Sequence, residues 1–369
     1  MKKQKKLALF TAFSGRGGVE RVNHNLLRGL SEYPLQVDLL AVIGKNGVLP
    51  EIPWDNVRVI RFRTRHSQLA LLELASYLKL EKPDVMLVAK YRAIRMAVVA
   101  RWLSGLKIPL VGQLHNKLSN PLSGNRAWQH RLHLAPARWL FPGVDKFICV
   151  SGGVAEDISR VVGISPQRIV TIANPVIAPG DTTDALRAET HPWCRDRSVP
   201  LVLGAGRLSR EKDFSTLIQA FGLLCRQRDC RLLILGEGSQ RPVLEAKIQT
   251  LGLQDRIALP GYTTHLPAYL AGASLVVLSS IWEGSGNVLV EALAQGIPVV
   301  STDCEGPREI LANGRYGLLV PVGDASAMAQ AMLRTLDEHL PAAMLKEAVR
   351  AYSIQESTKR YIEELGLLT

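Results

Sequence analysis

Two glutamates flank a short glycine-rich loop in the second half of the chain. Glu283 and Glu291 lie eight positions apart in the stretch IWEGSGNVLVEAL, on either side of a Gly-Ser-Gly-Asn loop. The apolar pattern that follows indicates a helix, so Glu291 falls about one turn inside it. Backbone N–H groups at the start of such a helix suit phosphate oxygens, and the Glu291 carboxylate can accept hydrogen bonds from both hydroxyls of a ribose. Glu283 would then face whatever lies beyond the phosphates.

Two cations occupy an earlier loop in the same half. The stretch GAGRLSREKDFSTLIQAF places Arg207 and Lys212 five residues apart, just before a helical pattern. A planar guanidinium and a flexible ammonium together suit a diphosphate. Each feature alone has a structural explanation, because loops often carry surface cations and helix dipoles favour acids near helix starts. In combination, the two acids, the glycine loop and the Arg/Lys pair predict a site for a nucleoside diphosphate.

A glycine-rich turn also follows the first apolar run. In LALFTAFSGRGGVERVNHNLLRGL, Gly17 and Gly18 stand where a strand passes into a helix, and they allow a close approach to an anion or a packed substrate. The turn is not a GxGxxG fingerprint. The acid expected about 20 residues later is poorly placed, since Asp38 sits inside a strand-like run. A purely structural turn explains this segment as well as a site does.

The elements that must position these residues are short apolar runs that alternate with helical patterns. Their continuity and branched residues predict buried parallel strands. In the first half the runs are LALFTA, QVDLLAVI, VRVIRF, DVMLVA, IPLVGQ and KFICV; in the second half they are PLVLGAG, RLLILGEG, RIALPG, SLVVLSS, IPVVST and GLLVPVGD. Two parallel α/β sheets in series are therefore expected, with ligand-binding residues at the carboxyl ends of the strands and in the cleft between the domains.

The composition sets further limits. A chain of 369 residues with 47% hydrophobic residues is long enough for two domains with separate cores. Five scattered cysteines without a CxxC pair predict reduced thiols in a cytoplasmic protein. The basic start MKKQKKLALFTAF is better explained as a first strand than as a signal peptide, because no small-residue cleavage site follows. No run of the sequence is long enough to cross a bilayer.

The positive charge is concentrated in the first half of the chain. Residues 1–180 contain 26 Lys and Arg against 11 Asp and Glu, whereas residues 181–369 contain 19 against 22. Such an excess indicates either a solvated surface or an anionic partner, which could be a membrane, a phosphorylated acceptor or a nucleic acid. Interleaved aromatics and RNA-binding motifs are missing, so we expect no nucleic-acid partner.

Taken together, the motifs resemble those of the retaining glycosyltransferases of family four, which have the GT-B fold. The resemblance is to bacterial enzymes that build envelope polysaccharide and lipopolysaccharide, and it spans almost the whole chain. Glu283 and Glu291 match the E-x7-E pattern of the family. The other matching stretches are GRLSREKDF, EGSGNVLVEALAQGIPVVSTDCEGPREIL, GGVERV, GQLHN, VSGGV, IANPV, LGEGSQRPVLEAKIQTLGL and LPGY.

The resemblance implies a role for each matching residue. Arg207 and Lys212 would bind the donor diphosphate and stabilise its departure, Glu291 would hold the ribose, and Glu283 would contact the donor sugar. His115 would lie beside the reacting sugar, although a structural hydrogen bond is the alternative for this histidine. The remaining donor-binding residues would be Gly17, Gly18, Gly236, Pro260, Gly261, Gly284, Gly286, Asn287 and Val288.

The same resemblance implies a domain plan. We expect an acceptor-binding Rossmann-like domain over residues 1–178, a linker over 179–198 and a nucleotide-sugar-binding domain over 199–351, with a C-terminal helix over 352–369 that packs back on the first domain. The implied activity is transfer of a sugar, with retention of its configuration, from a UDP-sugar to a glycan or lipid-linked acceptor. A sugar-nucleotide epimerase and a non-catalytic sugar-nucleotide-binding partner are the alternatives.

Two expectations concern partners. There is no DxD motif in the sequence, so we expect no metal and no cofactor beyond the nucleotide sugar itself. Residues 90–138 mix cations with Trp102 and Trp128, which is the composition of a surface that lies on an anionic leaflet. We therefore expect a cytoplasmic protein in peripheral contact with the inner face of the membrane, through a surface that includes Arg126, Arg131 and Arg138.

Overall fold

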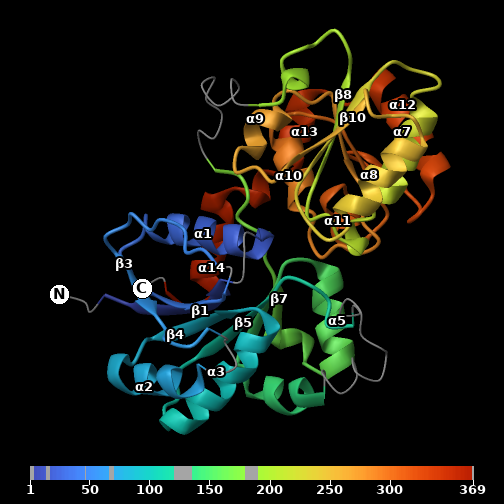
Figure 1. The fold of residues 1–369 in the computed structure, drawn as a ribbon. Coiled ribbons are helices and arrows are strands. Elements are labelled where there is room, and N and C mark those ends of the chain that lie inside the picture. The colour runs from blue at the N-terminus through green and yellow to red at the C-terminus, as the bar shows by residue number, and fades with distance from the viewer. Residues whose placement is uncertain are drawn as a thin grey trace. The chain divides into compact units, whose positions relative to one another are not determined.

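The chain divides into two α/β units, each built around its own parallel sheet (Figure 1). Unit 1 comprises Met1–Pro175 and Ile354–Thr369, and unit 2 comprises Val176–Ser353. The computed structural model describes residues 4–13, 17–45, 47–65, 70–119, 135–178 and 190–367. Of the linker expected over 179–198, residues 190–198 are described and belong to unit 2.

Unit 1 contains a sheet of seven parallel strands in the order β3-β2-β1-β4-β5-β6-β7. The strands are β1 (Lys6–Phe13), β2 (Gln36–Ile43), β3 (Val57–Arg61), β4 (Val85–Ala89), β5 (Leu110–Leu114), β6 (Lys146–Cys149) and β7 (Ile169–Thr171). The strand order reverses between β1 and β4. In open sheets of this kind, ligands bind beyond the carboxyl ends of the strands at that switch point.

Helices cover both faces of this sheet. One hydrophobic cluster packs α2 (Leu71–Glu81), α3 (Tyr91–Ser104) and α5 (Gly152–Val162) on one face. A second cluster packs α1 (Gly18–Leu30) and α14 (Ile354–Glu364) on the other. Two short 3-10 helices, η1 (Phe141–Gly143) and η2 (Pro166–Arg168), precede β6 and β7.

The C-terminal helix α14 is part of unit 1. Its Tyr361 is fully buried, and the Tyr361 hydroxyl accepts a hydrogen bond from Nε2 of Gln113 at 2.6 Å. Gly29 of α1 permits the close approach of the two helices, because a Cβ at that position would lie 2.0 Å from Oγ1 of Thr358. The chain thus returns from unit 2 to complete the core of unit 1.

Unit 2 contains six parallel strands in the order β10-β9-β8-β11-β12-β13. They are β8 (Leu201–Ala205), β9 (Arg231–Leu235), β10 (Ile257–Gly261), β11 (Leu275–Leu278), β12 (Val299–Thr302) and β13 (Leu318–Val320). The switch point here lies between β8 and β11, the first and fourth strands of the unit. It corresponds to the switch point between β1 and β4 in unit 1.

The helices of unit 2 also form two layers. One face carries α7 (Phe214–Leu224), α8 (Arg241–Thr250) and α12 (Ala325–Asp337). The other carries α9 (Leu266–Leu270), α10 (Asn287–Ala294), α11 (Glu305–Ile310) and α13 (Ala342–Ala348). The short 3-10 helices are η3 (Pro192–Cys194), η4 (Arg210–Lys212) and η5 (Arg350–Tyr352).

The prediction of two doubly wound parallel sheets is confirmed. The central strands β4, β5, β8 and β11 are almost completely buried, which explains why their sequences are continuous apolar runs without alternation. Among the described residues, no helix combines the length and apolar character needed to span a bilayer. All five cysteines are free thiols.

Candidate active site

Two loops of unit 2 meet at its switch point. One loop follows β8 and carries Arg207 and η4, which ends at Lys212. The other follows β11 and leads to Glu283. Hydrogen bonds join the loops directly, since Oγ of the buried Ser279 donates to the Lys212 carbonyl at 2.8 Å and the Ile281 N–H donates to the Glu211 carbonyl at 2.8 Å. Residues 67 and 70 positions apart in the sequence are thereby held side by side.

Lys212 and Glu283 form an ion pair across these loops. The Lys212 ammonium donates to Oε2 of Glu283, which also accepts from Oγ of Ser280 at 3.3 Å. The side chains of Lys212 and Glu283 are 21% and 15% exposed, so the pair is largely shielded from water. The sequence predicted both residues as donor contacts but gave no indication that they pair with each other.

Arg207 differs from Lys212 in having an unengaged side chain. The residue is exposed, and its guanidinium makes no ion pair or hydrogen bond with any residue that the structure describes. The switch point therefore presents one available cation and one cation that is held by a carboxylate. A diphosphate could bind Arg207 at once, whereas Lys212 would have to exchange Glu283 for a phosphate oxygen.

The predicted glycine loop opens α10. Gly286 is the residue before the helix and has φ +85°, a left-handed conformation that favours glycine. Asn287 and Val288 are the first two helical residues, where N–H groups have no partner within the helix itself. Glu291 lies one turn further on the same helix, on the face that also carries Asn287. An anion at this helix start and a polyol beside Glu291 fit the arrangement.

The next strand of unit 2 supports the Glu283 loop from behind. After β12, Oγ1 of the buried Thr302 donates to the Ser280 carbonyl at 2.6 Å, and Sγ of Cys304 donates to the same oxygen at 3.2 Å. The Gly306 N–H then donates to the Glu283 carbonyl at 3.3 Å. A Cβ on Gly306 would lie 2.7 Å from the backbone nitrogen of Ser285, so this position leaves no space for a side chain.

Two further predicted glycines lie on the other side of β8. Gly236 directly follows β9, and a Cβ there would lie 1.9 Å from the Gly206 carbonyl oxygen. Its N–H donates to the carbonyl of Gly261 at 2.8 Å. Pro260 and Gly261 end the edge strand β10, where Gly261 has φ +100°. These residues thus extend the same carboxyl edge away from the switch point, and Gly236 has a structural reason for lacking a side chain.

The predicted residues of unit 1 lie at the corresponding edge of the other sheet. Gly17 and Gly18 form the start of α1, and Gly17 has an ordinary extended conformation, with φ −104° and ψ 166°. The relevant property of this turn is therefore its lack of side chains. His115 follows β5 directly. Within unit 1 the structure places the glycine turn and His115 at one edge of the sheet. Within unit 2 it brings Lys212 and Glu283 together beside Arg207 and the start of α10.

The imidazole of His115 is uncharged at neutral pH. The pKa of His115 is lowered to about 4, chiefly by burial and also by the nearby Lys90 ammonium, while the Glu20 carboxylate acts in the opposite direction. Its Nε2 atom is buried without a hydrogen-bond partner among the described residues. The structural hydrogen bond that would explain this histidine is therefore missing at Nε2 in the part of the chain that the structure describes.

Two charged residues at this edge were not among those predicted from the sequence. Lys90 and Glu20 form an ion pair at 2.6 Å beside the glycine turn. Glu20 is part of the GGVERV motif and Lys90 directly follows the run DVMLVA, so a motif match for Glu20 and a position at a strand end for Lys90 were the available signals. No sequence pattern linked the two, because they are 70 residues apart.

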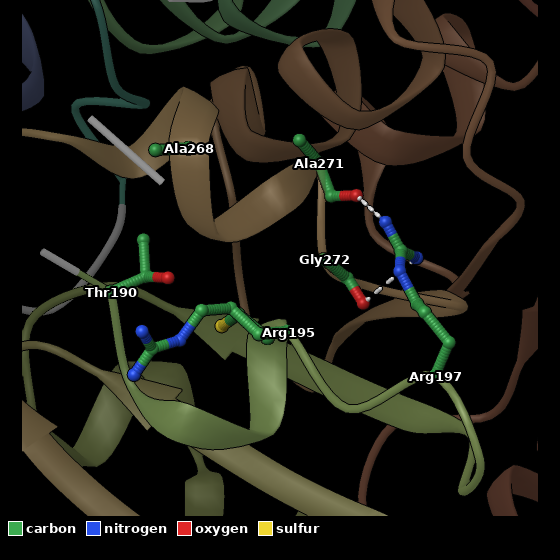
Figure 2. Close-up of a pocket in the computed structure, with 7 residues that line it drawn as sticks. Thr190, Arg195, Arg197, Ala268, Ala271 and Gly272 are labelled. Atoms are coloured by element: carbon green, nitrogen blue, oxygen red, sulfur yellow. Dashed lines mark hydrogen bonds between the residues drawn. The ribbon is translucent and has the colours of Figure 1, made fainter. Parts of the chain in front are cut away.

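A pocket elsewhere in unit 2 contains none of the predicted residues. Figure 2 shows its lining, which consists of Thr190, Cys194, Arg195, Arg197, Ala268, Ala271 and Gly272 around a space of about 200 Å³. The Arg197 guanidinium donates to the carbonyls of Ala271 and Gly272 at 2.5 and 3.3 Å, and so caps the end of α9. This arginine has a structural role that is complete without a ligand.

No cluster of three or more His, Cys, Asp or Glu side chains in the described parts of the chain has the arrangement of a metal site. The switch point of unit 2 carries the cations Arg207 and Lys212, the Glu283 carboxylate that pairs with Lys212, and the N-terminus of α10. This combination suits a dianionic group and the negative charge that would develop on it.

Comparison with known families places both units. A model described as Glycosyltransferase Family 4 matches residues 16–178, and a model described as Glycosyl transferases group 1 matches residues 199–338. The two matches fall on unit 1 and unit 2, and together they account for most of the chain.

Individual relatives agree with these matches. The chain is 27% identical, over 96% of its length and 97% of the relative, to the lipopolysaccharide core biosynthesis glycosyltransferase LpsE of Rhizobium meliloti. It is 28% identical, over 90% of both chains, to the N-acetylgalactosamine-N,N'-diacetylbacillosaminyl-diphospho-undecaprenol 4-alpha-N-acetylgalactosaminyltransferase of Campylobacter jejuni. The structure of Anabaena HepE in complex with UDP and glucose aligns with a TM-score of 0.77, at 20% identity and over 99% and 100% of the two chains.

These matches identify the two sheets as the two domains of a GT-B fold. The chain is an enzyme that belongs to the glycosyltransferases of family four.

Proposed function

We propose that this enzyme is a retaining glycosyltransferase that moves a sugar from a UDP-sugar to a glycan or lipid-linked acceptor during synthesis of bacterial envelope polysaccharide or lipopolysaccharide. Relatives named for the lipopolysaccharide core and for a diphospho-undecaprenol acceptor support the pathway and the acceptor, and a fold neighbour with UDP supports the base. The observation that carries the proposal is the group of Arg207, Lys212, Glu283 and the start of α10 around the switch point of unit 2.

In this proposal each group of unit 2 contacts a different part of the donor. Arg207 and Lys212 bind the diphosphate, and the N–H groups at the start of α10 bind its distal phosphate. Glu291 accepts hydrogen bonds from the ribose hydroxyls, and Glu283 contacts hydroxyls of the sugar. Pro260 and Gly261 border the base. In unit 1, Gly17 and Gly18 make room for the phosphate and acceptor, and His115 contacts the reacting sugar.

The proposed chemistry follows from where charge develops. Departure of the nucleoside diphosphate builds negative charge on phosphate oxygens while the sugar becomes oxocarbenium-like. Fixed cations and N–H donors stabilise this state more than the ground state. The acceptor hydroxyl attacks the anomeric carbon on the face from which the diphosphate leaves. The proton of this hydroxyl passes to the departing phosphate, and the configuration at the anomeric carbon is retained.

The proposed reaction does not use a metal ion. Arg207, Lys212 and the α10 N-terminus supply the positive charge that a divalent ion supplies in other transferases. Exhaustive chelation should therefore leave the transfer rate unchanged. Loss of activity in chelator, with recovery on addition of magnesium or manganese, would overturn this part of the proposal.

The donor can be identified by thermal-shift screening of nucleotide sugars. A ligand at a hundred times its dissociation constant stabilises the folded state by about 2.7 kcal/mol, which gives a clear shift in the melting temperature. A UDP-sugar should give the largest shift, and Glu291→Ala should reduce it. Selective stabilisation by a GDP-sugar would correct the base, and an equal lack of response to all nucleotide sugars would contradict the proposal.

Retention can be tested with the same donor. Proton NMR should show that the transferred sugar, or the sugar released slowly to water, first appears in the anomeric configuration of the donor. An inverted product would exclude the retaining mechanism. Accumulation of an epimeric nucleotide sugar without acceptor would instead support an epimerase.

We also propose that unit 1 makes peripheral contact with anionic lipids on the inner face of the cytoplasmic membrane. Three apolar side chains are strongly exposed, with exposed fractions of 78% for Trp102, 85% for Trp139 and 82% for Leu80. Each lies near the end of a helical segment that leads into the next strand, so all three belong to the amino edge of the sheet. Exposed cations accompany them, namely Lys79, Lys107 and Arg138. Aromatic side chains with neighbouring cations are typical of peripheral binding to anionic lipid. Arg126, Trp128 and Arg131 lie outside the described residues.

This surface lies at the edge opposite to the glycine turn and His115. Membrane contact should therefore tether the enzyme without changing its chemistry. Co-sedimentation should show salt-sensitive binding to vesicles with anionic lipid, and replacing both Trp102 and Trp139 with Ser should weaken it, whereas Val243→Ser in unit 2 should not. Equal binding to neutral and anionic vesicles, or binding to neither, would refute the membrane proposal.

A further inference from the structure

Lys90 has a backbone conformation that is unusual for a residue with a side chain. It directly follows β4 and has φ +76° and ψ 132°, outside the left-handed helical region that other non-glycine residues enter at turns. Lys82, by comparison, has φ 44° and ψ 60° and caps the end of α2 in the common left-handed form. Strain of the kind seen at Lys90 persists only where surrounding contacts enforce it, and it concentrates at functional sites.

The Lys90 side chain makes the contacts that enforce this conformation. Its ammonium donates to the carbonyl of Ala12 at 2.5 Å and to Oε1 of Glu20 at 2.6 Å. Ala12 lies near the end of β1, and Glu20 lies in the first turn of α1. One side chain that follows β4 thus contacts both the end of β1 and the first turn of α1, which begins at Gly18.

The strand register explains why Lys90 can reach this position. Phe10 of β1 pairs with Val88 of β4, so two further residues along each strand bring Ala12 beside Lys90. On the other side of β4, Ala89 pairs with Gln113 of β5, two residues before His115. Lys90 therefore stands between the glycine turn and His115 at the switch point of unit 1.

The Lys90–Glu20 pair parallels the Lys212–Glu283 pair in unit 2. Each pair joins a residue that follows the first strand of its unit to a residue that follows the fourth. The two pairs are similarly shielded, since the side chains of Lys90 and Glu20 are 25% and 13% exposed. Unit 1 therefore carries a charged pair at the same topological position as the candidate donor site.

We propose that Lys90 is a positioning residue for sugar transfer, which fixes the glycine turn to the end of β1 through Ala12 and Glu20. The proposal rests on the proposed function, because it assumes that this turn and His115 receive substrate. The Lys90 ammonium also opposes protonation of the neighbouring imidazole. Burial is the larger cause of the lowered pKa of His115, and the two effects together keep this imidazole uncharged, with Nε2 able to accept a hydrogen bond from a sugar hydroxyl.

The decisive variant is Lys90→Gly, which suits the backbone conformation and removes the ammonium. We expect a folded protein whose melting temperature stays close to that of the wild type, while kcat falls by roughly a hundredfold because the glycine turn loses its fixed position. The donor KM should change much less than kcat. Lys82→Gly is the matched control, since it also replaces a lysine with positive φ, and it should leave kcat unchanged.

A second readout separates positioning from a merely structural role. The pKa of His115, followed by NMR and assigned with His115→Gln, should rise in Lys90→Gly, because a cation that lowers it has gone and Glu20 remains. Glu20→Gln combined with Lys90→Gly should be no slower than Lys90→Gly alone, as expected for two residues that act as one unit.

Several results would overturn the proposal. Wild-type kcat in Lys90→Gly, or an unchanged titration of His115, would show that Lys90 does not act on this site. A large fall in melting temperature in both Lys90→Gly and Lys90→Met would show that the contact only holds the fold together. Failure of the proposed function is separate, because it would appear as a wild-type enzyme without transfer from any nucleotide sugar, while the His115 titration could still be measured.

Discussion

Neutralising Glu283 should separate binding of the nucleotide from transfer of the sugar. In the unliganded structure the Glu283 carboxylate holds the Lys212 ammonium, and both side chains are largely buried. Glu283→Gln keeps the shape of the side chain but removes this charge. A charge-assisted hydrogen bond of this kind contributes about 1.5–3 kcal/mol, and part of it must be given up when Lys212 turns to a diphosphate. Removing about 1 kcal/mol of that cost should tighten binding of UDP by roughly fivefold.

Transfer should respond in the opposite direction. If Glu283 contacts the donor sugar, Glu283→Gln should lower kcat by roughly two orders of magnitude, the scale lost with one preorganised polar partner. Titration calorimetry with UDP and a transfer assay on the same preparation would measure both effects, with Glu245→Gln on the exposed side of α8 as a control. Binding of UDP that is far weaker in Glu283→Gln than in the wild type would refute this division of roles.

Three other predictions follow from the same structure. Arg207→Ala should lower kcat by roughly two to three orders of magnitude in a transfer assay, because the unengaged Arg207 guanidinium is available to the leaving phosphate. Glu291→Ala, by contrast, should mainly weaken UDP binding, as measured by calorimetry. Gly306→Ala should slow transfer by roughly a hundredfold, since its Cβ would displace the Ser285 backbone; Gly222→Ala, whose Cβ would meet only flexible leucine side chains, should be active. Urea unfolding should show about 2 kcal/mol less stability at pH 5 than at pH 7 from His115 alone. The reason is that the pKa of His115 is about 4 in the folded protein against an ordinary 6.5, so its contribution to stability is complete above pH 6.5 and is lost as the pH falls toward 4. A pH profile of stability that His115→Gln leaves unchanged would contradict this prediction.

The sequence was sufficient to predict the sheets because their strands are buried on both faces. Runs such as DVMLVA and SLVVLSS are continuous for that reason, and they correspond to β4 and β11. The glycine loop before α10 was equally readable, since Gly286 needs a conformation that other residues avoid. Local physical requirements of this kind leave a visible pattern in a single sequence.

The charged pairs could not be predicted in the same way. Lys212 and Glu283 meet only because β8 and β11 are neighbours, and Lys90 and Glu20 meet only because β4 lies beside β1. Both contacts depend on the strand order, which reverses at each switch point and which apolar runs do not encode. The strained backbone of Lys90 was also hidden, because lysine gives no indication of a positive φ.

The most direct test of the central claim is to locate the donor on the chain by hydrogen–deuterium exchange with and without UDP. We predict protection in the loop that follows β8, around Arg207 and Lys212, and in the segment from Glu283 to Glu291 that opens α10. Glu291→Ala should weaken this protection. Protection confined to the pocket around Arg195 and Arg197, or none in unit 2, would contradict it.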